Sequence, residues 1–181
     1  MSEQDYTILS NENLDIKVDD DQISGSNLFI QAKDLTAQSG VAGFEKFAPI
    51  KAFSESFRNN IRKDSKQKSA SVGGTINSGF IEVYIPESIF SLELQKKGLS
   101  ADPIPQITVM KTVLVKNTRT AVTQLFYTDC NIVYVASQLG TYYFMRFAFD
   151  HRTVKRVSID DQGQKQGEFE FTYNVKESSV K

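Results

Sequence analysis

Apolar and polar residues alternate over most of the chain beyond residue 26, and this two-residue period is typical of β-strands with one buried face. Phe169, Phe171 and Tyr173, for example, alternate with Glu170 and Thr172. The pattern predicts strands over residues 27–32, 44–57, 80–85, 107–115, 122–127, 132–136, 142–149, 154–159 and 169–175. Turn residues recur at short spacing between them, which favours an antiparallel β-barrel or sandwich of eight or nine strands.

One stretch departs from this pattern and predicts a single short α-helix over about residues 86–97. Pro86 suits a first helical turn, and the Ser88 hydroxyl can accept a hydrogen bond from a free amide there. Gly98 supplies the left-handed residue that commonly ends a helix. The expected apolar stripe consists of Ile85, Ile89 and Leu92, with Phe90 and Leu94 beside it. A stripe this wide must pack against the strands.

Two further expectations concern the second half of the chain. Asp129 or its neighbours should bend the chain before the strand at 132–136, and residues 117–119 should form a hairpin turn. The run 142–149 is apolar on both faces apart from Arg146, so we expect both of its faces to be covered.

Residues 58–77 form a polar connection of unusual length for a compact domain, and connections of this kind are often functional. Its basic residues are Arg58, Arg62, Lys63, Lys66 and Lys68. Nucleic-acid binding is disfavoured because no aromatic residues are interleaved with these cations and the whole chain has a net charge of −1. A solvated loop or a contact with another protein is the better interpretation.

The charge is divided unevenly along the chain. Residues 1–26 hold seven acids, including Asp19, Asp20 and Asp21, against the single Lys17, which gives −6 and leaves +5 for the remainder. We therefore expect an acidic flexible extension over 1–26 and a single β-domain over 27–181. The alternation of Leu14, Ile16 and Val18 leaves open an added edge strand within the extension.

The composition, with 40% hydrophobic and 24% charged residues, is that of an ordinary globular domain. No apolar run approaches the ~18 residues of a membrane span, so no membrane insertion is expected. The N-terminus lacks a basic region followed by an apolar one, so no cleaved signal peptide is expected.

No enzyme class is supported by the sequence, and we expect no catalytic, cofactor or metal site. Cys130 is the only cysteine, which excludes an intrachain disulfide and indicates a small core residue in a strand. His151 is the only histidine and has no serine or cysteine partner motif, so a solvated loop residue is the better interpretation. The run 71–75 lacks the lysine and helix start of a phosphate loop.

Several segments, taken in chain order, resemble the Hcp (haemolysin-coregulated protein) family. Hcp proteins are the tube subunits of type VI secretion systems and are themselves similar to phage tail-tube proteins. The matching segments are 27–35, Phe44 with 48–54, 80–85 followed by 88–92 and Gly98, 103–109, 126–133 and 147–149. Two features depart from the family: the acidic residues before the first strand, and the lack of the usual aromatic around residues 154–157.

The resemblance implies a β-barrel with one helix that assembles as six-membered rings, stacked into a hollow tube inside a sheath. Sheath contraction would expel the tube, and effectors would travel in its lumen, so the implied partners are further copies of the chain, sheath, spike and effector proteins. The tube would assemble in the bacterial cytoplasm and be secreted without a cleaved signal peptide.

Within this resemblance, residues 58–77 correspond to the family's extended loop. Arg58, Arg62, Lys63, Lys66 and Lys68 are then the expected assembly contacts, and Asp19, Asp20 and Asp21 would shield or dock on them. Two alternatives stay open, namely a phage-type tail-tube protein and a monomeric β-barrel that binds a small ligand.

Overall fold

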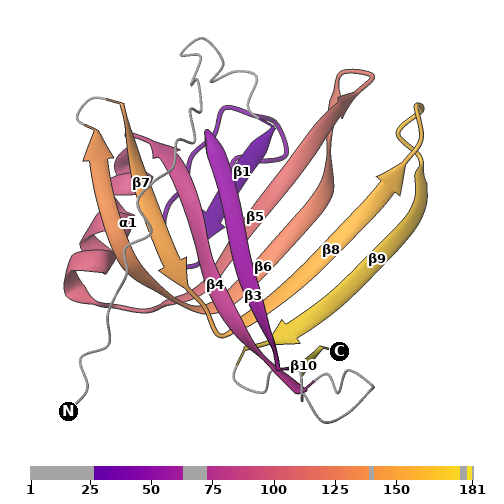
Figure 1. The fold of residues 1–181 in the computed structure, drawn as a ribbon. Coiled ribbons are helices and arrows are strands. Elements are labelled where there is room, and N and C mark those ends of the chain that lie inside the picture. Colours follow the sequence, from indigo (N-terminus) through magenta and orange to yellow (C-terminus); the bar gives the residue numbers. More distant parts are fainter. Residues whose placement is uncertain (1–26, 63–72, 139–140, 176–178, 181) are drawn as a thin grey trace, which may run out of the picture.

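The computed structural model describes residues 27–62, 73–138, 141–175 and 179–180, which form antiparallel β-sheets and one helix (Figure 1). The elements in chain order are β1 (Leu28–Ala32), β2 (Ala48–Pro49), β3 (Ala52–Arg62), β4 (Gly73–Pro86), α1 (Ile89–Ser100), β5 (Ile104–Val115), β6 (Thr118–Gln138), β7 (Tyr142–Ala148), β8 (His151–Ile159), β9 (Lys165–Asn174) and β10 (Ser179–Val180). The predicted antiparallel fold with one short helix is confirmed.

The strands are arranged in two layers that share β6. Sheet A has the order β10-β9-β8-β6-β5-β1-β2, and sheet B pairs β3 with β4, β4 with β7, and β7 with β6. Among the described residues, β3 has no partner beyond β4, and β9 meets β10 only at Tyr173 and Asn174. The sheet is therefore an open sandwich, and no described pairing closes it into a barrel.

The bend predicted at Asp129 is confirmed, and it joins the two sheets. Asp129 has a φ of 54°, in the left-handed region that Asp tolerates better than most residues. The two strands predicted at 122–127 and 132–136 are parts of β6. The part of β6 before Asp129 pairs with β5 and β8, Cys130 makes one last pair with Ile104 of β5, and the part from Asn131 onward pairs with β7.

The core lies between the two sheets and is filled by side chains. Its largest fully buried members are Tyr127, Phe29, Phe147, Ile30, Ile81, Ile85, Leu94, Ile104, Ile107, Met145, Val83 and Val109. Cys130 is fully buried in β6, as expected. No helix among the described residues is long and apolar enough to span a membrane.

The helix begins later than predicted. Pro86 is the last residue of β4 and not part of a first helical turn. Ser88 is the N-cap: its hydroxyl accepts from the Ser91 amide at 3.2 Å, and its own amide donates to the Ser91 hydroxyl at 2.8 Å. The helix ends at Ser100, and the left-handed residue after it is Ala101 with a φ of 55°.

Gly98 lies inside the helix and does not end it, because its missing side chain serves packing. A Cβ at Gly98 would lie 3.1 Å from a methyl group of Ile132 and 3.5 Å from one of Val135. The helix therefore approaches β6 closely at this glycine. The predicted apolar stripe is wrong in part: Phe90 and Leu94 are buried, but Ile89 and Leu92 are exposed.

Three other expectations need correction. Residues 58–77 are not one loop, because β3 continues to Arg62 and pairs with β4 from Gly73 onward, forming a two-stranded hairpin. Only one face of β7 is covered, since alternate residues are buried and the others are half-exposed. His151 is the first residue of β8 and half-buried, so it is not a solvated loop residue.

Candidate assembly surfaces

The β3–β4 hairpin extends past the body of the sandwich (Figure 1), and it carries part of the predicted basic cluster. Arg58 and Arg62 lie on β3, opposite Asn77 and Gly73. Lys63, Lys66 and Lys68 lie outside the described residues. Asp19, Asp20 and Asp21 also lie outside them, so the predicted contact between the acids and the basic cluster stays a prediction.

A hydrogen-bonded ion pair anchors β3 to sheet A. The guanidinium of Arg152 in β8 donates to both carboxylate oxygens of Glu55 in β3, and the Nε contact is 2.8 Å long. The hydroxyl of Tyr127 in β6 donates to the same carboxylate at 2.5 Å. Burial and the neighbouring Glu55 raise the pKa of the fully buried Tyr127 phenol, which keeps it a donor.

A bulge in β3 lies next to this anchor. The pairing register with β4 shifts between Glu55 and Phe57, and the backbone of Ser56 approaches Gly79 closely. A Cβ at Gly79 would lie 1.7 Å from the Ser56 carbonyl oxygen, so only glycine fits there. The Phe57 side chain beyond the bulge is 72% exposed.

The outer face of sheet B is aromatic around one ion pair. Arg146 in β7 donates to Glu82 in β4 at 2.8 Å from Nε and lies within 2.6 Å of it through Nη2. The Arg146 guanidinium also lies 5.5 Å from the ring centre of Phe80 and 5.9 Å from that of Tyr134. Tyr84, Tyr142 and Phe144 extend the cluster. A surface of this composition suits a protein contact.

The outer edge of β9 is a second candidate contact, because most of its backbone has no described strand beside it. On the convex side of this edge the charges are paired: Lys155 lies 2.5 Å from Glu168 and 3.7 Å from Glu170. Hydrogen bonds from Lys155 and Lys165 lower the pKa of Glu168 to about 2. This side is therefore a stable polar surface.

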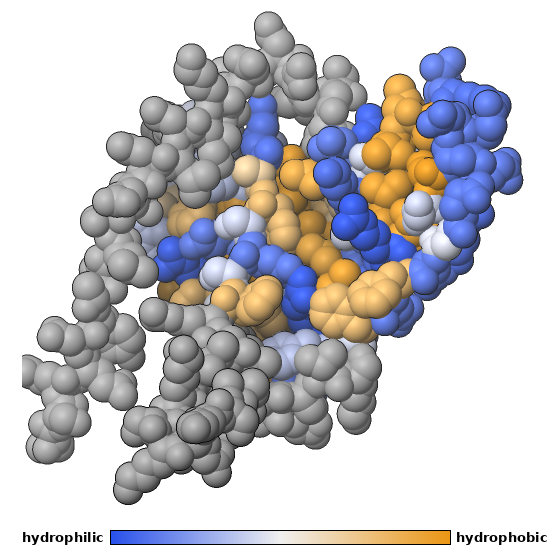
Figure 2. Space-filling view, turned by 45° about the vertical axis from the view of Figure 1, so that its right-hand side comes forward, coloured by the Kyte–Doolittle hydropathy of each residue, from blue (hydrophilic) through white to orange (hydrophobic). Residues whose placement is uncertain are grey.

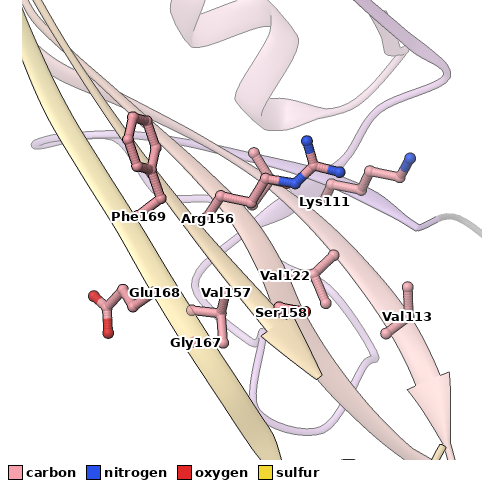
Figure 3. Close-up of a pocket in the computed structure, with 10 residues that line it drawn as sticks. Lys111, Val113, Val122, Arg156, Val157, Ser158, Gly167, Glu168 and Phe169 are labelled. Carbon is pink, nitrogen blue, oxygen red and sulfur yellow. The ribbon is translucent and has the colours of Figure 1, made fainter. Parts of the chain in front are cut away.

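The concave side of the same strands is different and forms an open groove of about 530 Å³ (Figure 3). Lys111, Thr123, Arg156 and Phe169 are aligned across β5, β6, β8 and β9 by the strand register and lie on one face. Arg156 extends toward Lys111, and Phe169, 63% exposed, stands on the same side (Figure 3). Figure 2 shows the hydrophobic residues of this region bordered by hydrophilic ones.

Catalytic chemistry finds little support on these surfaces. No group of three or more His, Cys, Asp or Glu side chains placed to hold a metal ion occurs in the described part of the chain. Burial raises the pKa of the Cys130 thiol to about 12, so it is protonated at neutral pH and a poor nucleophile.

The groove and the aromatic face were missed by sequence reasoning. Lys111, Thr123, Arg156 and Phe169 come from four different strands, and only the pairing register brings them into one row. The exposed apolar residues of α1, among them Leu99 at 84%, were also missed, because the apolar residues of this helix are not confined to one face.

Comparison with known proteins supports the fold and nothing finer. No protein-family model and no curated protein sequence matches the chain. Among solved structures, a type six secretion system protein matches with a TM-score of 0.74 at 13% identity, covering 85% of this chain and 98% of that one. Hcp1 from Salmonella typhimurium matches with a TM-score of 0.65 at 14% identity, covering 85% and 97%. A type VI secretion system effector from Yersinia pestis matches with a TM-score of 0.61 at 18% identity, covering 82% and 99%.

These structural neighbours are Hcp proteins and other proteins of type VI secretion systems, so the resemblance drawn from the sequence is confirmed at the level of the fold. They are matched over nearly their whole length.

Proposed function

We propose that this chain is a structural, non-enzymatic subunit of an inner tube of the type VI secretion kind. Residues 27–181 form the tube domain and residues 1–26 an acidic extension. The observation that carries the proposal is the match over 98% of a type six secretion system protein with a TM-score of 0.74. The subunits assemble as hexameric rings that stack inside a sheath, are expelled by its contraction, and carry effectors.

The surfaces of the described residues support assembly into rings. A ring needs heterologous contacts, in which one surface of a subunit meets a different surface of the next. The chain offers two open strand edges, β3 and β9, each with a largely exposed phenylalanine, Phe57 and Phe169. Unpaired backbone groups on such edges are satisfied when a neighbouring chain adds its own strand.

The basic residues of the hairpin are the second part of the proposal. Arg58, Arg62, Lys63, Lys66 and Lys68 contact a neighbouring subunit or ring, and the Glu55 ion pair supports this arrangement by fixing β3 to sheet A. Secretion with the tube and contacts with sheath, spike and effector proteins belong to the same proposal.

Light scattering and negative-stain electron microscopy of the purified protein test the proposal. We expect a hexamer mass and ring-shaped particles. Reversal of three hairpin charges, in Lys63→Glu, Lys66→Glu and Lys68→Glu combined, should weaken the rings or their stacking. The matched control reverses three exposed lysines on the body, Lys33, Lys46 and Lys96, with the same change in net charge. A protein that stays monomeric over a wide concentration range contradicts the proposal.

A phage-type tail tube is the remaining candidate within the same fold, and neighbouring genes for a sheath and a contraction ATPase would distinguish the two. A monomeric ligand-binding barrel has less support, because the core between the sheets is filled by large side chains such as Tyr127, Phe29 and Phe147. The grooves that the structure does show open to the surface.

A further inference from the structure

The concave groove of sheet A carries two cations that nothing described neutralises. Lys111 and Arg156 are both exposed, are separated on the sheet only by Thr123, and form no ion pair or hydrogen bond with any described residue. In contrast, Lys155 on the opposite face of the same strand is paired with two carboxylates. Two like charges directed to one place favour an acidic occupant between them.

The groove is also a continuation of the core face. One row inward, Leu125, Val154 and Phe171 pair across the same strands, and the first two are at most 9% exposed. The next row, with Thr123, Arg156 and Phe169, faces the same side but is open, because no described strand of sheet B covers it. The occupant must therefore offer apolar side chains as well as acids.

The chain itself has one segment of this chemistry. Between Glu12 and Asp21, five acids accompany the alternating apolar residues Leu14, Ile16 and Val18. In an extended conformation these three side chains point to one side together with those of Glu12 and Asp20, whereas Asp15, Lys17 and Asp19 point to the other side. The segment thus matches the groove in both charge and hydrophobicity.

The first described residue also lies beside the groove. Asn27, the first described residue, lines a second groove that shares Lys111 and Thr123 with the first. Its carbonyl accepts from the Thr112 amide at 2.7 Å, which fixes the exit point beside Lys111. Because β1 is antiparallel to β5 and Leu28 lies opposite Lys111, Asn27 lies at the end of this pairing that is nearer to Val113, which lines the first groove.

The reach is sufficient. Val18 and Asn27 are nine Cα–Cα steps apart, and an extended chain spans about 3.3–3.6 Å per step, or about 30 Å in total. The four strands that line the groove cover three interstrand spacings of about 4.8 Å each, or about 14 Å. The segment can therefore lie across Lys111 and Arg156 within one chain.

We propose that the acidic segment Glu12–Asp21 docks in cis in the concave groove of sheet A, with its apolar side chains beside Phe169 and its carboxylates at Lys111 and Arg156. This docking does not depend on tube assembly and can be tested in a monomeric or an assembled protein.

Hydrogen exchange followed by mass spectrometry on the full-length protein tests the docking. We expect the amides of residues 14–18 to exchange at least about tenfold more slowly than in a synthetic peptide of residues 10–24. The slowing should disappear in the double variant Lys111→Glu, Arg156→Glu and weaken at high salt. The control variant Lys46→Glu, Lys96→Glu, with a similar change in net charge, should retain it.

Several outcomes would overturn the proposal. The first is amide exchange of residues 14–18 in the wild-type protein at the rate of the peptide. The second is slow exchange that is lost when the charges of Lys66 and Lys68 are reversed but is kept when those of Lys111 and Arg156 are reversed. The third is slow exchange that depends on protein concentration. The second outcome places the segment on the basic hairpin, and the third places it on a neighbouring copy.

Disulfide trapping provides a second measurement in the full chain. Ile16→Cys combined with Val113→Cys, a residue that lines the groove, should form an intramolecular disulfide under mild oxidation. Ile16→Cys combined with Leu114→Cys is the matched control, because Leu114 is the next residue of β5, on the opposite face, and is 63% exposed. Equal trapping of the two pairs would also contradict docking in the groove.

Discussion

Replacement of Glu55 tests whether one carboxylate holds β3, and with it the basic hairpin, against sheet A. In Glu55→Ala the buried Tyr127 hydroxyl loses its acceptor, and an unsatisfied buried group costs about 1–3 kcal/mol. Arg152, whose side chain is only 15% exposed, loses its bidentate partner at the same time. Removing one member of a buried pair costs about 3–5 kcal/mol, so we expect a total in that range after allowing for the partial exposure of Glu55.

Two milder variants separate the contributions. Glu55→Gln keeps one oxygen that can accept from Tyr127 but removes the charge and replaces the second acceptor by an amide nitrogen, so we expect a loss of about 1–2 kcal/mol. Tyr127→Phe removes a donor but leaves the Glu55 carboxylate bound to Arg152, and should cost about 1 kcal/mol. The order of destabilisation should be Glu55→Ala, then Glu55→Gln, then Tyr127→Phe.

Urea titration followed by far-ultraviolet circular dichroism gives the free energies of unfolding for this series. A double-mutant cycle between Glu55 and Arg152 should give a coupling energy of about 1–3 kcal/mol. The reasoning is refuted if Tyr127→Phe costs as much as Glu55→Ala, since the phenol would then matter for packing and not as a donor. It is also refuted if the coupling energy is zero.

Four further changes have expected outcomes. Gly79→Ala should destabilise the protein by at least about 3 kcal/mol in urea titration, because its Cβ would lie 1.7 Å from the Ser56 carbonyl oxygen; a wild-type midpoint contradicts this. Cys130 should react with thiol reagents at pH 8 only as fast as the protein unfolds; rapid labelling of the folded protein contradicts its burial. The contacts with Lys155 and Lys165 lower the pKa of Glu168 from 4.5 to about 2. They therefore stabilise the fold above pH 4.5, and this stabilisation is lost as the pH falls toward 2. The melting temperatures of the wild type and Glu168→Gln should therefore differ at pH 6 and converge near pH 2; a constant difference contradicts the pairing. Deletion of residues 1–26 should alter assembly and its salt dependence by light scattering, and unchanged assembly at every ionic strength contradicts a role for the extension.

The parts of the fold that the sequence predicts are those determined by local patterns. Alternation located most of the strands because each of them buries one face, as β9 buries Tyr173 and β8 buries Val154. The Ser88 cap and the bend at Asp129 are local too, since each depends on the chemistry of one or two residues. These features needed no knowledge of which strands are neighbours.

The parts that could not be predicted depend on distant partners. The ribbon of β3 and β4 up to Arg62 is polar along much of its length, so it shows no alternation and looks like a loop. Gly98 looks like a helix terminator until Ile132 is placed beside it. Glu55 is 72 positions from Tyr127 and 97 positions from Arg152 in the sequence, so no local pattern predicts their contact.

The two faces of sheet A explain why the groove is proposed as a contact and the convex face is not. Along β8 the successive cations Lys155 and Arg156 point to opposite faces and have opposite surroundings. Lys155 is neutralised by acids on the adjacent strand, whereas Arg156 faces Lys111 and an exposed phenylalanine. Exposed aromatic surface and the repulsion between unpaired like charges both raise the free energy of a face that is in contact with water. The same row becomes favourable once an acidic, apolar chain segment covers it, and residues 12–21 are the nearest segment of this kind along the chain.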